Sequence, residues 1–96
     1  MSTKEMLDEG ERLAAFIGRS IPGIKTAIDD VTPLGYWIDI AKGEMADDSV
    51  IAVVEYKVDK SYGISRIKGE ISYGEGHEFS ADTREELIRT LQELLK

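Results

Sequence analysis

The sequence predicts an α+β fold: a two-layer sandwich in which an antiparallel β-meander of four to five strands carries an N-terminal and a C-terminal helix on one face. Three observations predict it. Apolar residues recur with a period of two through residues 34–59, as in strands with one buried face. The segments before and after the strands instead carry apolar residues at helical spacing. No internal repeat or linker interrupts the 96 residues, so residues 1–96 are expected to form one domain.

The first helix is expected from near Ser2 to near Gly18. Ser2 followed by Glu5 fits a capping box, in which the hydroxyl and the carboxylate satisfy free backbone donors. The apolar stripe at helical spacing consists of Met6, Leu7, Leu13, Ala14 and Ile17. Gly10 lies on the same stripe, where a glycine costs about 1 kcal/mol relative to alanine in an open helix interior. It either admits a close neighbour or is simply tolerated.

Residues 24–31 alternate in polarity, which suits an edge strand, although a short helix fits this segment almost as well. Residues 34–59 are expected to form a β-hairpin whose even positions lie beneath the helices. These positions are Leu34, Tyr36, Ile38, Ile40, Val50, Ala52, Val54, Tyr56 and Val58. The next run changes phase after Ile64, which indicates a β-bulge or two shorter strands. A short last strand is expected from His77 to Ser80.

The second helix is expected to begin at Asp82, with Glu85 completing a capping box. Its apolar stripe consists of Leu87, Ile88, Leu91, Leu94 and Leu95. Full burial of one aliphatic side chain contributes about 1.5–3 kcal/mol. This stripe is therefore expected to lie on the sheet, beside the stripe of the first helix.

The odd positions of the hairpin are expected on the opposite face of the sheet. Asp39, Glu55 and Lys57 suit a hydrated surface, but apolar residues occur among them. The predicted interface consists of Trp37, Ile51, Val53, Tyr62 and Ile64, the last two joining through the phase change. Exposed apolar groups of this kind favour a homodimer or a protein partner, contacted through this face or a strand edge. The alternative is a minor second core, covered by a loop or by residues 24–31.

The acidic turns are a second candidate site. The predicted oxygen ligands of a weak Ca²⁺ or Mg²⁺ site, or of a small ligand, are Glu44, Asp47 and Asp48. This segment lacks the EF-hand spacing, and acidic turns are more often simply solvated. His77 is the single histidine, and without a second histidine or a cysteine it cannot form a zinc site. Neither His77 nor Asp39 belongs to a nucleophile–base arrangement, so we expect a non-enzymatic protein without a cofactor.

The composition narrows the classes of partner. A formal net charge of −7 argues against nucleic acid and anionic membranes, because both are bound mainly through Lys and Arg. The only candidate basic strip, expected to be a solvated sheet edge, consists of Lys57, Lys60, Arg66 and Lys68. The absence of cysteine excludes thiol catalysis and Cys-ligated metals. No apolar run suits a signal peptide or a membrane span, so a soluble cytoplasmic protein is expected.

Overall fold

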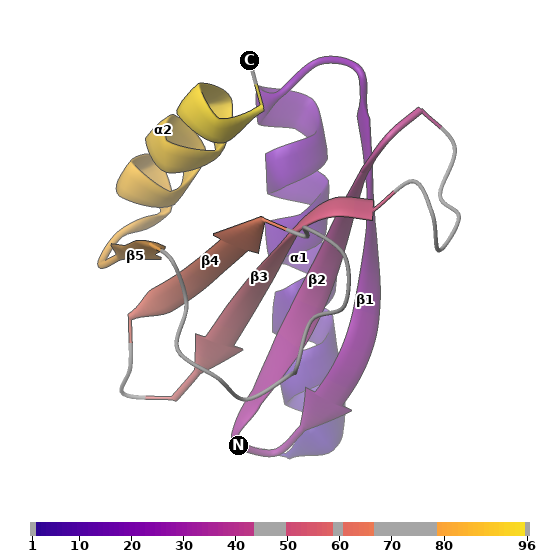
Figure 1. The fold of residues 1–96 in the computed structure, drawn as a ribbon. Coiled ribbons are helices and arrows are strands. Elements are labelled where there is room, and N and C mark those ends of the chain that lie inside the picture. Colours follow the sequence, from indigo (N-terminus) through magenta and orange to yellow (C-terminus); the bar gives the residue numbers. More distant parts are fainter. Residues whose placement is uncertain (1, 44–49, 59–60, 67–78, 96) are drawn as a thin grey trace.

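The computed structural model has the predicted α+β architecture (Figure 1). It describes residues 2–43, 50–58, 61–66 and 79–95. The described strands form one antiparallel sheet in the order β1-β2-β3-β4-β5. The strands are β1 (Ile24–Thr32), β2 (Gly35–Lys42), β3 (Val50–Lys57), β4 (Tyr62–Arg66) and β5 (Phe79–Ala81). The helices are α1 (Thr3–Ser20) and α2 (Arg84–Leu94). Residues 24–31 are therefore a strand, and it lies at the edge of the sheet, as expected.

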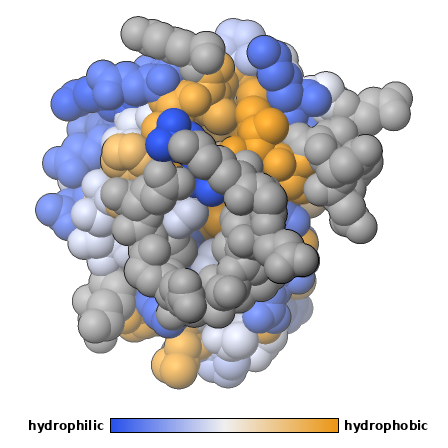
Figure 2. All heavy atoms as spheres, viewed as in Figure 1, coloured by the Kyte–Doolittle hydropathy of each residue, from blue (hydrophilic) through white to orange (hydrophobic). Residues whose placement is uncertain are grey.

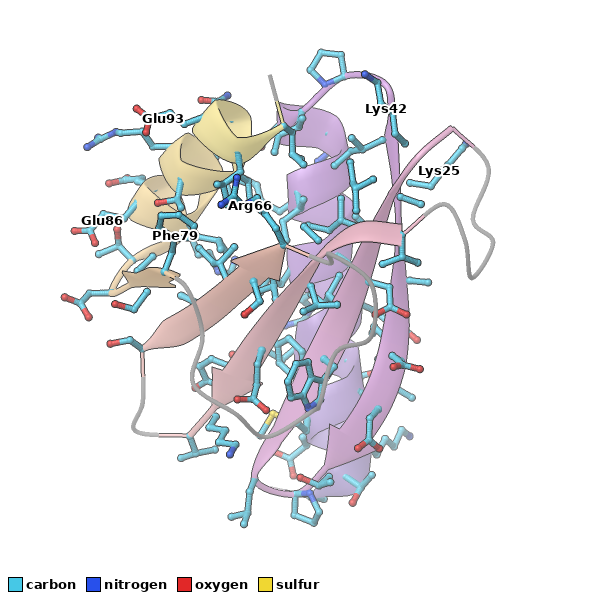
Figure 3. All side chains as sticks on the ribbon, in the orientation of Figure 1. Lys25, Lys42, Arg66, Phe79, Glu86 and Glu93 are labelled. Atoms are coloured by element: carbon cyan, nitrogen blue, oxygen red, sulfur yellow. The ribbon has the colours of Figure 1, made fainter. Side chains whose placement is uncertain are left out.

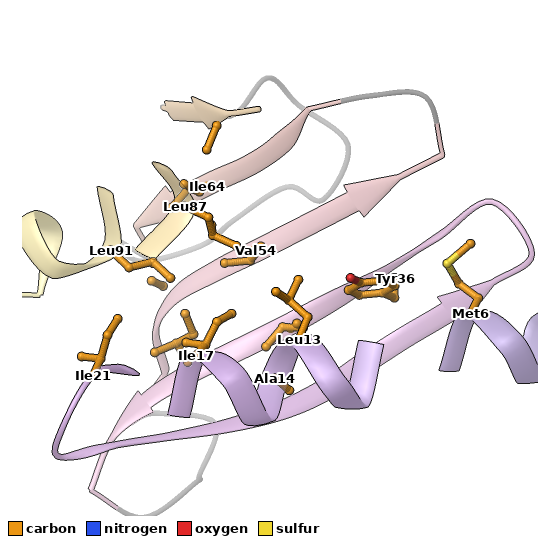
Figure 4. Packing of buried hydrophobic residues seen from close by; sticks show 14 residues of the cluster. Met6, Leu13, Ala14, Ile17, Ile21, Tyr36, Val54, Ile64, Leu87 and Leu91 are labelled. Atoms are coloured by element: carbon orange, nitrogen blue, oxygen red, sulfur yellow. The ribbon is translucent and has the colours of Figure 1, made fainter. Parts of the chain in front are cut away.

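Both helices pack on the same face of the sheet. Leu13 and Ile17 of α1 and Leu87 and Leu91 of α2 are buried in one cluster with the inward side chains of the strands (Figure 4). The strands contribute Tyr36, Ile38, Ile40, Ala52, Val54, Ile64 and Ala81 to this helix-side core. Packing on this face of the sheet removes the apolar stripes of both helices from water, and this burial stabilises the two-layer arrangement.

Strand register confirms which side chains face the helices. Tyr36 lies opposite Tyr56, and Ile38 lies opposite Val54. Directly opposite residues of an antiparallel pair share one face, so Tyr36, Ile38, Val54 and Tyr56 point together toward the helices. The expectation is wrong for Leu34 and Val58, which lie outside the strands and are 71% and 36% exposed. It is also wrong for Val50, which pairs with Ala41 of the outer face after a register shift. The rings of Tyr36 and Tyr56 are 5.2 Å apart, and that of Tyr62 lies 5.4 Å from Tyr56. A row of three tyrosines thus crosses the helix side of the sheet.

The expectation that Tyr62 and Ile64 lie on the outer face is wrong. Ile64 is opposite Val54 and is 0% exposed within the helix-side core. Tyr62 packs against the same core. Pairing with β3 keeps the alternation of β4 in step with that of β3, so Tyr62 and Ile64 share the face of Tyr56 and Val54. The phase change that suggested otherwise concerns residues 67–78, which lie outside the described residues.

A register shift in β1 affects the edge of the sheet. Ile28 pairs with Ile38, whereas Asp30 pairs with Trp37. Asp29 is therefore the additional residue of a β-bulge, a feature that often occurs in edge strands and bends them locally. The alternation of polarity in residues 24–28 ends at this bulge.

The cap of α1 agrees with the prediction. The Glu5 N–H donates to Ser2 Oγ at 3.2 Å, and Ser2 Oγ donates to the Glu5 carboxylate at 3.1 Å. The helix continues two residues past Gly18 and ends at Ser20. Its last turn is closed by a bond from the Ile21 N–H to the Ile17 carbonyl.

The cap of α2 differs from the prediction by one residue. Thr83, not Asp82, is the N-cap, and its Oγ1 accepts from the Glu86 N–H at 3.1 Å. Glu86, not Glu85, completes the box by accepting from the Asp82 N–H at 3.1 Å. Asp82 instead accepts a hydrogen bond of 2.6 Å from the Ser61 hydroxyl. The pairs Asp82 with Glu85 and Thr83 with Glu86 both have the spacing of a capping box. The hydrogen bond to Ser61 holds Asp82 outside the helix.

Candidate interaction surface

The outer face of the sheet, turned away from the helices, carries Trp37. Trp37 pairs with Glu55, and Asp39 pairs with Val53. Trp37 does not belong to the helix-side core, which agrees with the predicted sidedness. In Figure 1 α1 lies behind the sheet, so this outer face is turned toward the viewer. The same view in Figure 2 shows hydrophobic and hydrophilic areas side by side.

The predicted apolar patch is smaller than the sequence suggests. Val53 is 1% exposed, although it is not part of the helix-side core. Ala41, on the same face, is also buried. Trp37 and Ile51 are partly buried. The burial of Val53 agrees with the alternative of a minor second core, and a contact role for Trp37 and Ile51 stays a prediction.

Ile51 occupies a second register shift. Ile40 pairs with Ala52, but the next pair joins Ala41 to Val50. Ile51 therefore has no directly opposite residue on β2. The shift lies where β3 begins, and it brings Val50 rather than Ile51 next to Ala41.

A groove of about 390 Å³ lies beside Trp37, at the end of the sheet where β1 turns into β2. Its lining includes Asp30 and Thr32 of β1, Trp37 of β2, and Glu55 and Lys57 of β3. Lys57 Nζ is 3.9 Å from Glu55 Oε1, and the two side chains are 58% and 12% exposed. At this distance, and with the Lys57 ammonium mostly in water, the pair contributes little to stability. The sequence pattern points to Trp37 but not to a groove, because Asp30 and Glu55 reach it only through strand pairing.

The edge strand β1 is the longest of the strands that the structure describes, with nine residues. The strand at the other edge of the described sheet, β5, has only three. The inward side chains of β1 all remain partly exposed: Ile24, Thr26, Ile28 and Val31. Tyr36, Ile38 and Ile40 of β2, which have a neighbouring strand on both sides, are instead buried. A long edge strand presents backbone donors and acceptors to a further strand.

A second hollow, of about 550 Å³, lies along this edge between α1 and β1. Leu7, Ala14 and Ala15 of α1 line one side, and Ile28 and Val31 of β1 line the other. Leu7 is among the most exposed large apolar side chains in the described part of the chain. At this edge of the described sheet, β1 has a neighbouring strand on one side only, and apolar surface is accessible beside it.

The predicted basic strip does not form one surface. Arg66 pairs with Ala52, a residue of the helix-side core, and so faces the helices. Its guanidinium carbon lies 6.0 Å from the centre of the Phe79 ring, beside α2 (Figure 3). Lys57 lines the groove on the outer face. Lys60 and Lys68 lie outside the described residues.

The predicted cation site cannot be placed, because Glu44, Asp47 and Asp48 lie outside the described residues, as does His77. Within the described ranges, no three His, Cys, Asp or Glu residues are grouped so as to hold a metal ion. Neither helix described here is long and apolar enough to cross a membrane. The cytoplasmic location stays a prediction.

Fold and surface together define a small two-layer α+β protein with a long strand at one edge and an aromatic groove on its outer face. Comparison with known proteins finds no matching family model, and no significant match among curated proteins or solved structures.

Proposed function

We propose that this chain is a self-associating interaction module in which two copies join through their β1 edges and extend the antiparallel sheet across a two-fold axis. The charge pattern of β1 supports this proposal. Lys25 and Asp29 lie two residues before and two residues after Ala27. When two β1 strands pair about Ala27, Lys25 of each copy lies opposite Asp29 of the other. Both side chains are exposed.

The two faces of the strand agree with this pairing. Lys25 pairs with Ala41 and Ala27 with Asp39, so Lys25 and Ala27 belong to the outer face. Asp29, the additional residue of the bulge, is exposed on the same strand. On the helix side, Thr26 of one copy would lie opposite Ile28 of the other. Association would then remove part of the exposed apolar surface of Ile28 from water, which favours the dimer. The bulge ends regular pairing at Asp29.

The expected association is weak and reversible. Opposite charges directly across a strand pair contribute about 0.2–1 kcal/mol, and two-fold symmetry supplies the pair twice. A single pair of strands buries less surface than a standard stable interface. The net charge of −7 on each copy also opposes close approach. We therefore expect a dimer that dissociates on dilution.

Charge exchange tests the proposal. Sedimentation equilibrium over a range of concentrations should show that Lys25→Asp and Asp29→Lys each weaken the dimer, because like charges then face each other. The double variant should regain wild-type association, since the pair is restored with opposite polarity. Arg89→Asp, at an exposed position of α2, changes the net charge by the same amount as Lys25→Asp and should leave association unchanged.

Two results would contradict the proposal: a monomer at every concentration, or a double variant no better than the single ones. Trp37→Asp distinguishes the edge from the outer face. Pairing through β1 should survive this substitution, whereas stacking of two outer faces through Trp37 should not.

A further inference from the structure

Asp30, Trp37 and Glu55 form a row across three adjacent strands. Asp30 of β1 and Glu55 of β3 are each directly opposite Trp37 of β2. Directly opposite residues share one face and have Cβ atoms about 4.5–5.5 Å apart. The indole is therefore flanked by one carboxylate on each side. All three residues line the groove of about 390 Å³.

Gly35 lines the groove beside this row. It lies two residues before Trp37 on β2, between Thr32 and Lys57 of the neighbouring strands. A Cβ at Gly35 would overlap the Tyr56 carbonyl oxygen. The close strand packing thus demands glycine here, so the groove wall carries no side chain at this position.

The charges around the groove select the kind of ligand. The lining holds two carboxylates, those of Asp30 and Glu55, and one ammonium, that of Lys57. Lys57 is close to Glu55 but is mostly exposed, whereas the Glu55 side chain is mostly buried. An anion would meet two carboxylates of like charge, whereas a cation would meet opposite charge on both sides of the indole. A divalent metal needs several converging oxygens, and indole supplies none.

We propose that this groove binds a small organic cation through an alkylammonium group, held against the indole of Trp37 and between Asp30 and Glu55. Aromatic faces attract cations of this type, and tryptophan does so most strongly. The groove volume lies near the lower end of the range for small-molecule sites, which suits a ligand of few atoms. The site lies at the turn end of β1, and the proposal is independent of self-association.

Trp37 is the single tryptophan of the chain, so its fluorescence reports directly on the groove. Titration with tetramethylammonium chloride should give a saturable change in emission, with half-saturation in the millimolar range. Sodium chloride at equal ionic strength and tert-butanol, a neutral molecule of similar shape, should give none. The NMR signal of the indole N–H provides a second readout in the same titration.

Isosteric variants identify the groups involved. Asp30→Asn and Glu55→Gln should each weaken tetramethylammonium binding by about two- to fivefold, the range for a partly exposed ion pair. Glu93→Gln, on the exposed face of α2, makes the same charge change away from the groove and should bind as wild type does. Lys25→Asp, which disrupts the proposed dimer, should also retain binding.

Three results would overturn the proposal. One is the absence of a response in both fluorescence and NMR. Another is an equal response to tert-butanol. The third is unchanged affinity in both Asp30→Asn and Glu55→Gln. A dimer that fails to form would not affect any of these readouts, so the two proposals stand or fall separately.

Discussion

Gly10 of α1 lies against the ring of Tyr36: a Cβ added at Gly10 would come within 3.2 Å of Tyr36 Cγ and of Ile28 Cδ1. The glycine on the apolar stripe of α1 is therefore required for a close neighbour and is not merely tolerated. It lets the helix lie near the sheet at the point where a bulky aromatic side chain fills the space beneath it.

Gly10→Ala should destabilise the protein. Alanine improves helix propensity by about 1 kcal/mol, but overpacking a core costs about 1–3 kcal/mol, and the root of a buried ring cannot easily move. We expect a net loss of about 1 kcal/mol in urea unfolding. Gly18→Ala is the control, because its Cβ would lie 3.9 Å from Thr26 Oγ1, an ordinary contact. It should stabilise by up to about 1 kcal/mol; equal stability of the two variants would contradict the packing argument.

Gly35→Ala should be far more damaging than substitution of a glycine in a turn. The new Cβ would overlap the backbone of Tyr56 and lie 3.1 Å from Lys57 Cα. Neither strand can shift without breaking the β2–β3 pairing, so we expect a loss above about 3 kcal/mol. Gly43→Ala faces open space and is opposed only by a φ of +89°, at a cost of about 1–2 kcal/mol. Thermal unfolding of the two variants provides the test, and similar midpoints would refute it.

Tyr36→Phe should not destabilise the protein near neutral pH. Tyr36 is 1% exposed, and its hydroxyl has no hydrogen-bond partner among the described residues. Removing a buried polar group that lacks a partner is neutral or stabilising by up to about 1–3 kcal/mol. Urea unfolding at pH 7 checks this, and a marked loss of stability would indicate that the hydroxyl is hydrogen-bonded in solution.

The same substitution should flatten the loss of stability at alkaline pH. Burial raises the pKa of the Tyr36 hydroxyl, and the nearby Glu9 carboxylate adds to the increase. The unfolded chain releases this proton near pH 10, while the folded chain retains it. The folded state then binds more protons, so this contribution is complete below pH 10 and is lost as pH rises further, by up to about 1.4 kcal/mol per unit. The free energy of unfolding of Tyr36→Phe should therefore fall less between pH 9.5 and 11 than that of the wild type. Parallel profiles of unfolding free energy against pH would contradict this prediction.

Thr83→Ala should destabilise α2 by about 1 kcal/mol, the usual effect of removing an N-cap side chain. Thr83 Oγ1 accepts the Glu86 N–H, and alanine cannot. Thr90→Ala makes the same chemical change in the middle of α2, where the hydroxyl donates to the Glu86 carbonyl. That variant should be as stable as wild type or more so, because alanine favours the helix interior. Amide hydrogen exchange in α2 locates the effect, and comparable losses in both variants would argue against Thr83 as the cap.

Much of the fold could be predicted because it depends on local periodicity. The alternation in residues 34–59 predicted that Tyr36, Ile38 and Val54 face the helices and that Trp37 does not. Ser2 is the N-cap of α1, as its spacing from Glu5 predicts. The N-cap of α2 lies one residue after the predicted one because Asp82 with Glu85 and Thr83 with Glu86 fit the same pattern. The bond from Ser61, distant in sequence, distinguishes the two.

The candidate sites depended more on contacts between distant segments. Ile64 lies on the helix side, contrary to the expectation, because the phase of β4 follows from its pairing with β3 and not from its own residues. The groove beside Trp37 forms because Asp30 and Glu55, on different strands, are brought opposite one residue. No single segment carries that information.

By itself the sequence determined the class of fold, the number of layers and the buried side of each helix, because side-chain spacing along a strand or helix is a property of the local backbone. Only the tertiary structure decided the register of β4, the burial of Val53, the accessibility of the β1 edge and the position of the groove. Each of these depends on which strands become neighbours, and that is settled by packing the whole chain around one core.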